Sequence, residues 1–410
     1  MLDKKYLPFS EAIELLLDEV SEIRMSVEEI PIEEAYERVL AKDIVAPENL
    51  PGFKRSTVDG FAVRARDTFG AKESFPAYLK LKGEVEMGKQ PDFKLLPGET
   101  AYIPTGGMLP EGADAVVMVE HASIAGDLVE IFHPVSPFEN VILEDEDVAK
   151  GEIVLKAGTV LKPQHIGALA GLGVCSVEVF KKPVVGIILT GDEIVPPDKK
   201  PSPGEVRDIN SFTLAGLILK AGGIPKKYGI VRDERKTLEE VLNRAFNECD
   251  VLLVSGGTSA GTKDMTAELI NELGSPGILF HGVRIRPGKP LIGALCKNKP
   301  VFGLPGHPVA VFITFELFVK PVIFSMTGVR EPQHKKTVKA VLKRRISSQP
   351  GRTDFVRVRL EREGEKLFAI PLIAKSGLIM SLALADAILT VPEELGGIEE
   401  GEEVEVQLLD

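Results

Sequence analysis

The chain has 410 residues, of which 44% are hydrophobic and 27% charged, with a formal net charge of −12 and a pI near 5.3. The length predicts two to four domains, and the composition excludes a disordered or fibrous protein. The negative charge argues against non-specific binding to nucleic acid or to an anionic membrane surface, so an anionic ligand would need a locally basic pocket.

Targeting and metal-binding signals are missing from the sequence pattern. The first ten residues lack the regions of a secretory signal, and no apolar run reaches about 18 residues. We therefore expect a cytoplasmic protein that does not enter a membrane. Cys175, Cys249 and Cys296 lie far apart, and the six histidines show no metal-site spacing, which predicts neither a disulfide framework nor a zinc site.

The N-terminal part predicts a helical platform interrupted by an inserted β domain. Residues 10–20, with Ser10 as N-cap, and residues 32–40 have the spacing of amphipathic helices. Short alternating segments follow from 75 to 145, and residues 151–174 then return to a helical pattern. We expect the platform to comprise residues 1–50 and 147–182, and the inserted domain residues 51–146.

Two loops of the inserted domain carry polar groups beside glycine. Asp59 precedes Gly60 within a segment that otherwise suits a strand, and Thr105 and Gly106 follow a predicted strand. A plain Asp-Gly turn is the structural alternative for Asp59.

After Pro183, strands alternate with helices, which predicts a parallel α/β sheet over residues 183–330. Three strands end in loops that bear acids: Asp192 and Glu193 after the first, Asp233 after the second, and Asp264 after the glycines that follow the third. Ligands of such sheets bind at the carboxyl ends of the strands, and carboxylates select a hard cation such as Mg²⁺.

The loop after the apolar strand 251–254 combines glycine with hydroxyl groups. Its residues Ser255, Gly256, Gly257 and Ser259 precede a helix expected from about Lys263. Such a loop presents backbone N–H groups to an anion, although a tight turn explains the glycines equally well. The spacing of a Walker phosphate loop is not met.

A basic turn follows in the same domain. Arg284, Arg286 and Lys289 lie within six residues of one another, and Pro290 closes the turn. A solvated charge run is the alternative to an oxyanion site. The loop with Pro305, Gly306 and His307 comes next, where His307 fits the N-cap position of a helix over residues 309–319. From 331 to 410 the pattern predicts a small C-terminal β domain, with Arg352 and Ser376 in its loops.

Six motifs in this order closely resemble the MoeA family of molybdopterin molybdenumtransferases, which includes the C-terminal domain of gephyrin. They are Arg-Ser-Thr-Val-Asp-Gly-Phe-Ala from Arg55, Pro-Thr-Gly-Gly from Pro104, Thr-Gly-Asp-Glu from Thr190, Ser-Gly-Gly-Thr-Ser from Ser255, Pro-Gly-Lys-Pro from Pro287 and Gly-Leu-Pro-Gly-His-Pro from Gly303. Arg286 departs from the lysine usual in the family turn, and His307 stands where asparagine is common.

The resemblance implies a multidomain α/β plus β fold with a small barrel-like C-terminal domain, and a homodimer with its active site between protomers. It implies that adenylylated molybdopterin and molybdate or tungstate are substrates, and that Mg²⁺-dependent hydrolysis releases AMP as the metal is inserted. The adenylyltransferase that supplies the substrate would be a partner.

The resemblance also implies roles for individual residues. Catalysis would fall to Asp59, Asp233, Asp264 and Lys289. Substrates would be bound by Thr105, Gly106, Ser255, Gly256, Gly257, Ser259, Arg286, Pro290, Pro305, Gly306, Arg352 and Ser376. The metal ligands would be Glu193, Asp233 and Asp264. The alternatives are a molybdopterin adenylyltransferase and a non-catalytic pterin-binding scaffold.

Overall fold

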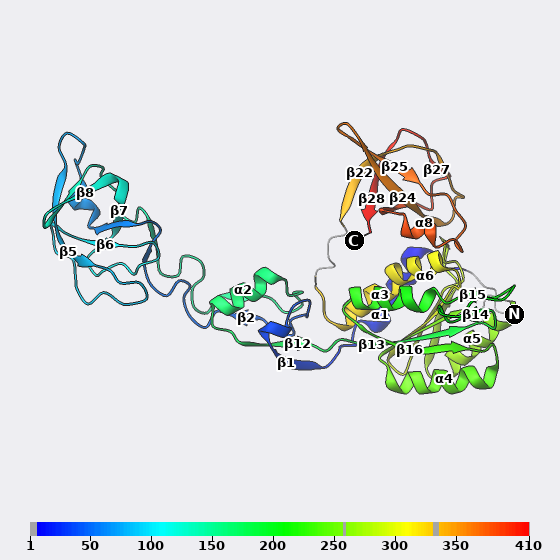
Figure 1. The fold of residues 1–410 in the computed structure, drawn as a ribbon. Helices are drawn as coiled ribbons and strands as arrows, with labels where there is room; N and C mark the ends of the chain where they lie inside the picture. The colour runs from blue at the N-terminus through cyan, green and yellow to red at the C-terminus, as the bar shows by residue number, and fades with distance from the viewer. Residues whose placement is uncertain (1–5, 257–259, 331–335, 410) are drawn as a thin grey trace.

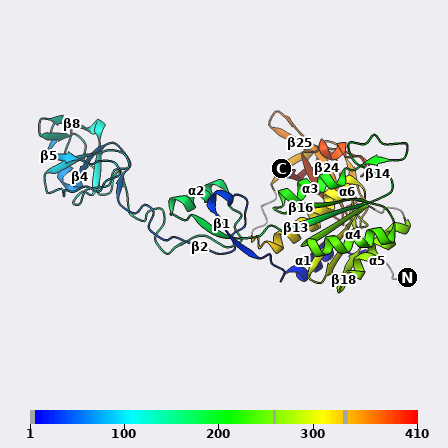
Figure 2. The same cartoon turned by 60° about the horizontal axis from the view of Figure 1, so that its bottom comes forward.

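The computed structural model describes residues 6–256, 260–330 and 336–409, with the backbone alone for residues 260–264. The described chain is elongated, with an all-β unit at one end and an α/β sheet with a small barrel at the other (Figure 1, Figure 2). A narrow platform joins the two ends. The predicted fold class is confirmed, including the β unit inserted into the N-terminal platform.

The α/β unit is built on a six-stranded sheet with the order β16-β13-β17-β21-β20-β18. The strands are β13 (Val184–Thr190), β16 (Ile224–Val231), β17 (Val251–Gly256), β18 (Pro276–His281), β20 (Ile292–Cys296) and β21 (Lys299–Leu304). The first four in the sheet order are parallel, whereas β20 and β18 run antiparallel to their neighbours. The sheet is therefore mixed, while its parallel part places the loops after β13, β16 and β17 at one edge.

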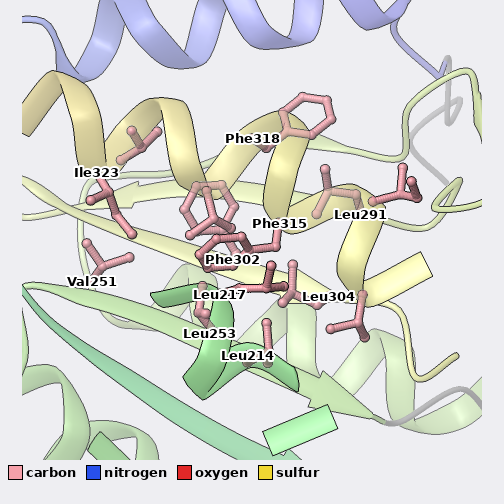
Figure 3. Close-up of a cluster of buried hydrophobic side chains, with 14 of the residues drawn as sticks. Leu214, Leu217, Val251, Leu253, Leu291, Phe302, Leu304, Phe315, Phe318 and Ile323 are labelled. Carbon is pink, nitrogen blue, oxygen red and sulfur yellow. The ribbon is translucent and has the colours of Figure 1, made fainter. Parts of the chain in front are cut away.

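Both faces of this sheet are covered, which explains why β17 is apolar throughout. Val251 and Leu253 join the core cluster on one face, and Leu252 and Val254 join the cluster on the other. The covering helices are α3 (Asn210–Lys220), α4 (Arg235–Glu248), α5 (Ala260–Glu272) and the long helix after β21. Figure 3 shows the first cluster, with side chains of the sheet, α3 and the long helix close together.

The long helix comprises α6 (Pro308–Thr314), a π-helical turn η4 (Phe315–Val319) and α7 (Lys320–Met326). Among the described residues it alone has the length and mean hydropathy, 1.9, that a membrane span requires. However, 61% of it is buried in the protein, and Phe315 and Phe318 lie fully within the α/β core. It is thus the core helix of the sheet unit.

The first helix, α1 (Phe9–Val20), packs in the α/β core and not on the platform. Ala12, Leu16 and Val20 are fully buried in the same cluster as the sheet residues. The expectation that this helix belongs to the platform is therefore wrong. Pro8, and not Ser10, is its N-cap.

The platform contains less helix than predicted. β1 (Val27–Pro31) pairs with β12 (Ser176–Phe180), β2 (Ile44–Val45) pairs with β11 (Ile153–Leu155), and α2 (Pro163–Gly171) packs beside them. The predicted helix over residues 32–40 is wrong, because only the 3₁₀ turn η1 (Ile32–Glu34) forms. Leu40 instead forms an antiparallel β-bridge with Val179. Tertiary contacts therefore override the helical spacing of this segment.

The inserted unit contains a six-stranded sheet with the order β7-β4-β6-β5-β9-β8. Its strands are β4 (Gly60–Val63), β5 (Ala77–Glu84), β6 (Glu99–Ile103), β7 (Ala115–Met118), β8 (Ala122–Ala125) and β9 (Leu128–Ile131). The short pair β3 (Arg55–Ser56) and β10 (Val141–Ile142), with the 3₁₀ turns η2 (Ala65–Thr68) and η3 (Val119–His121), completes the unit. Separate apolar clusters fill its two sides.

The C-terminal unit is a closed five-stranded barrel. Its strands are β22 (Thr337–Leu342), β24 (Thr353–Glu363), β25 (Lys366–Pro371), β26 (Ala387–Val391) and β28 (Glu403–Leu408). The pairing of β24 with β26 closes the ring. The short strands β23 (Ile346–Ser347) and β27 (Gly397–Ile398) and the helix α8 (Met380–Ala383) lie at its ends.

Candidate functional site

A cleft of about 1070 Å³ lies between the α/β unit and the barrel. Residues 284–290 and 305–307 line one side, and residues 346–357 and 372–376 contribute to the other. The two sides meet because β19 (Ile285–Arg286) pairs in parallel with the start of β24, with Arg286 opposite Asp354. The basic turn of the sheet unit is thereby fixed against the barrel.

The cleft is cationic although the whole chain carries a net charge of −12. Among the residues that the structure describes, its charged lining consists of Arg284, Arg286, Lys289, Arg352, Arg357 and Lys375 together with a single acid, Asp354. The structure brings together here the predicted catalytic residue Lys289 and the predicted substrate residues Arg286, Pro290, Pro305, Gly306, Arg352 and Ser376. A concentration of guanidinium and ammonium groups in a half-enclosed space suits an oxyanion.

The buried carboxylate of Asp354 orients two of these cations. Its oxygens accept hydrogen bonds from Nε and Nη2 of Arg352 at 2.8 and 3.3 Å. Arg286 Nη1 lies 3.6 Å from Asp354 Oδ2, although the Arg286 side chain is mostly exposed. Asp354 therefore fixes the fork of Arg352 and draws Arg286 toward the same part of the cleft.

His307 connects the sheet unit to the barrel. It occupies the N-cap position of α6, with Pro308 at the first turn, but its side chain does not cap the helix. Instead, His307 Nδ1 lies 2.9 Å from Ser376 Oγ, and the backbone N–H of Val309 donates to the Ser376 carbonyl at 3.2 Å. The residue that departs from the common family pattern thus holds the loop that carries Ser376.

A second polar group lies where the parallel strands end. The buried hydroxyl of Thr190, at the end of β13, donates to Asp233 Oδ1 after β16. The N–H of Asp233 lies 3.4 Å from Asp192 Oδ1. This contact fixes the orientation of Asp233 at the edge of the sheet where ligands of α/β proteins bind.

The acids of this edge suit a hard cation, although they do not form a complete protein cage. In the part of the chain that the structure describes, no three His, Cys, Asp or Glu residues lie close enough to hold a metal ion. Mg²⁺ is commonly held by one or two carboxylates plus substrate phosphates and water, and Asp233 and Glu193 supply carboxylates in the loops after β16 and β13. The third predicted ligand, Asp264, has its side chain outside the described residues.

The glycine loop after β17 begins with a close backbone approach. Gly256 has a φ of +132°, and a Cβ on it would lie 1.8 Å from the Thr190 carbonyl oxygen. The Ser255 hydroxyl is fully buried and donates to the Pro305 carbonyl at 3.2 Å, so it holds two loops together and does not face a ligand. The predicted contacts Gly257 and Ser259 lie outside the described residues.

Replacing Gly256 by alanine is expected to destabilise the protein by at least about 2 kcal/mol, because the methyl group would collide with the backbone at a positive φ. Thermal or urea unfolding measures the change. Gly216→Ala is the control: this residue lies in α3 with open space around it, and the substitution should stabilise by about 0.5–1 kcal/mol. Equal stability of Gly256→Ala and the wild type would contradict the close approach.

Asp59 and Thr105 lie in the inserted β unit, which is at the opposite end of the molecule from the cleft (Figure 1). Asp59 Oδ1 accepts hydrogen bonds from the N–H and the hydroxyl of Thr105 at 2.7 and 2.9 Å. The neighbouring Gly106 has a φ of +83°, and its N–H donates to the Ser56 carbonyl. A single chain therefore does not bring these residues to the cationic cleft.

The Thr105 backbone and hydroxyl hydrogen bonds lower the pKa of Asp59. Because its pKa is lower in the folded than in the unfolded chain, the ionised Asp59 stabilises the fold at pH values above the ordinary aspartate pKa of about 3.9. This stabilisation is lost as the pH falls through the folded-state pKa. Asp59→Asn should therefore lower the melting temperature at pH 7, and the difference from the wild type should shrink in acid. An equal difference at pH 7 and in strong acid would contradict this assignment, and Asp92→Asn in the same unit is the control.

Several residues of the site were not predicted from the sequence, among them Asp354, Arg357 and Asn210. Asp354 and Arg357 lie on a strand whose alternation predicts only a β element, and nothing in the sequence pairs them with the basic turn. Asn210 is buried at the start of α3 and donates to Ser255 Oγ at 3.0 Å and to the Gly306 carbonyl at 2.8 Å. Asn210 contacts the loops of Ser255 and Gly306 only in the folded sheet, so its sequence position does not predict this role.

Fold and site together define a multidomain α/β protein with a strand-edge acid group and a separate cationic cleft against a C-terminal barrel. Three family models match the chain in order: the MoeA N-terminal region (domain I and II) over residues 7–173, the probable molybdopterin binding domain over 186–325, and the MoeA C-terminal region (domain IV) over 339–409.

Individual relatives match over nearly the full length. A molybdopterin biosynthesis protein of Methanocaldococcus jannaschii is 39% identical over 100% of this chain and 99% of its own. The molybdopterin molybdenumtransferase of Bacillus subtilis is 34% identical over 93% and 89%. A crystal structure of the molybdopterin biosynthesis MoeA protein from Pyrococcus horikoshii OT3 is similar with a TM-score of 0.86 and 37% identity, covering 99% of this chain and 100% of that chain. The chain belongs to the MoeA family of molybdopterin molybdenumtransferases, enzymes of molybdenum cofactor biosynthesis.

Proposed function

We propose that this chain inserts molybdate or tungstate into adenylylated molybdopterin, with Mg²⁺-dependent hydrolysis of the adenylyl linkage and release of AMP. The main support for the proposal is the cationic cleft between the basic turn and the barrel, in a protein whose net charge is negative. Membership of the family supports the reaction class. The cytoplasm is the proposed location, and the adenylyltransferase that supplies the substrate is a proposed partner.

The metal oxyanion is assigned to the cleft. Arg286, Lys289 and Arg352 would bind its oxygens, while Pro290 and Ser376 shape the same wall. Guanidinium and ammonium groups combine positive charge with several N–H donors, which suits them to hold a dianion. Lys289 would then stabilise the oxyanion during its transfer.

The adenylylated pterin is assigned to the strand edge. Gly256 and Gly257, with Ser259, would present backbone and hydroxyl groups to its phosphates, while Pro305 and Gly306 would contact the substrate from the adjoining cleft and Ser255 holds the two loops together. Asp233, oriented by Thr190, would accept a proton from the attacking water. Mg²⁺ held by Glu193, Asp233 and Asp264 would neutralise charge on the phosphate oxygens.

The reaction can be tested with purified protein, adenylylated molybdopterin, Mg²⁺ and molybdate. AMP should appear together with a cofactor that activates a molybdenum-free apoenzyme. Absence of AMP under these conditions would overturn the proposal. ATP-dependent adenylylation of molybdopterin would instead indicate an adenylyltransferase, and tight binding without turnover would indicate a scaffold.

We further propose a homodimer in which Asp59, Thr105 and Gly106 of one copy complete the site of the other, since one chain keeps them apart. Mixing Asp59→Asn chains with Lys289→Ala chains should restore about a quarter of the wild-type activity, because half of the dimers are mixed and each has one intact site. Mixed dimers that stay as inactive as the separate variants would contradict shared sites.

A further inference from the structure

Asn210 is a buried amide at the edge of the sheet where the parallel strands end. It is the first residue of α3 and is 7% exposed. Its Nδ2 donates to Ser255 Oγ in β17 at 3.0 Å and to the carbonyl of Gly306, which follows β21, at 2.8 Å. Because β17 and β21 are neighbours in the sheet, one side-chain amide joins the ends of both strands.

The helix α3 is held in place without this amide. The N–H of Ser211 donates to Asp208 Oδ1 at 2.9 Å, and the Ser211 hydroxyl also donates to Asp208. Leu214 and Leu217 fix the apolar side of the helix in the core, as Figure 3 shows. Burial of an amide is unfavourable unless hydrogen bonds compensate for it, so the contribution of Asn210 is its bonds to the two loops.

An amide can make this connection and a carboxylate cannot. The Gly306 carbonyl has no hydrogen to donate, and the Ser255 hydroxyl already donates to the Pro305 carbonyl. Both atoms therefore need a donor such as Nδ2. The Oδ1 of Asn210 is shielded from solvent and has no partner among the described residues, so only the donor end of the amide is used within that part of the chain.

The loop that Asn210 holds also contacts the barrel. His307 Nδ1 lies 2.9 Å from Ser376 Oγ, and the N–H of Val309 donates to the Ser376 carbonyl at 3.2 Å. Residues 305–307 and Ser376 line the cationic cleft. Contacts therefore run from the end of β17 through Asn210 and residues 305–307 to the cleft.

We propose that Asn210 is a positioning residue, which fixes the strand edge assigned to the adenylylated pterin relative to the oxyanion cleft. This inference rests on the proposed function for the identity of the two ligands. Nδ2 joins the loops of Ser255 and Gly306, and α3, packed in the core, provides a rigid support. A displacement of either loop by about 1 Å would misplace the reacting groups, which can lower a rate by about 10²-fold.

Hydrogen exchange at the Val309 amide tests the structural part of the proposal without any ligand. This N–H bonds to Ser376, so it reports whether the loop before α6 stays in place. Asn210→Asp removes the donor at nearly constant size and should accelerate the exchange about tenfold. Val322, buried in α7 of the same long helix, should exchange at the wild-type rate. Unchanged exchange at Val309 in Asn210→Asp overturns the proposal.

Turnover tests the positioning role. Asn210→Asp should raise the KM for molybdate and lower the rate of AMP release, each about tenfold, because both loops lose their connection. Ser211→Ala is the matched control, since it removes the hydroxyl bond to Asp208 at the same helix end without contacting either loop. It should keep wild-type exchange and turnover. Equal losses in both variants, or wild-type turnover of Asn210→Asp, would overturn the proposal.

If Asn210→Asp does not fold, Asn210→Ala decides, because it removes the donor without adding a charge. The same losses in exchange protection and turnover are expected, and wild-type values for both overturn the proposal. The proposed function fails separately, through missing AMP release by the wild type, since hydrogen exchange needs no turnover.

Discussion

Lys289→Ala is expected to reduce molybdate insertion at limiting molybdate by roughly 100-fold, the effect typical of losing one charged group that stabilises a reacting anion. The ammonium group of Lys289 lies 4.3 Å from the ring centre of Tyr6 at the cleft wall. This cation–π contact positions the charge without neutralising it. The measurement is the rate of active-cofactor formation as a function of molybdate concentration.

The loss in Lys289→Ala should diminish as molybdate is raised, because the lysine acts on the oxyanion. Lys339→Ala removes an exposed lysine from the barrel, where it pairs with Glu403, and should leave the rate unchanged. If the rate of Lys289→Ala depended on molybdate concentration as the wild-type rate does, Lys289 would not act on the oxyanion.

Asp233→Asn is expected to slow AMP release by about 10²–10⁴-fold, as is usual when a general base is removed. The amide is nearly the same size as the carboxylate and can still accept the Thr190 hydrogen bond, so the fold should persist. Oxyanion binding in the cleft should change little. A rapid-quench assay of AMP formation separates these effects.

Glu234→Gln provides a matched control for Asp233→Asn, since the adjacent acid is exposed and bonds to Thr237. Near-wild-type AMP formation by Asp233→Asn would show that another acid activates the water. Asp264 would then be the acid to replace next.

The sheet and the strand-edge loops were predictable because their signals are local. The apolar run of β17 identifies a strand buried on both faces, and alternation of its side chains between the two core clusters bears this out. The acids after β13 and β16 could be placed at one edge of the sheet from the sequence, because parallel strands have their carboxyl ends at the same edge.

Features that depend on distant contacts were not predictable in this way. The amphipathic face of α1 has the same spacing whether it covers a platform or the α/β sheet, and only packing decides. The segment 32–40 has helical spacing, yet strand pairing at Leu40 and Val179 determines its structure. The arrangement of Arg357 arises from contacts between β24 and the loop 372–376, which no motif in the sequence links.

A single-turnover experiment that counts AMP and inserted metal in the same reaction tests the proposed reaction most directly. With adenylylated molybdopterin, Mg²⁺ and molybdate, wild-type protein should produce equal amounts of AMP and metal-loaded cofactor, and Lys289→Ala should produce little of the loaded cofactor. Metal-loaded cofactor formed without AMP, or substrate bound without either product, would contradict the proposed reaction.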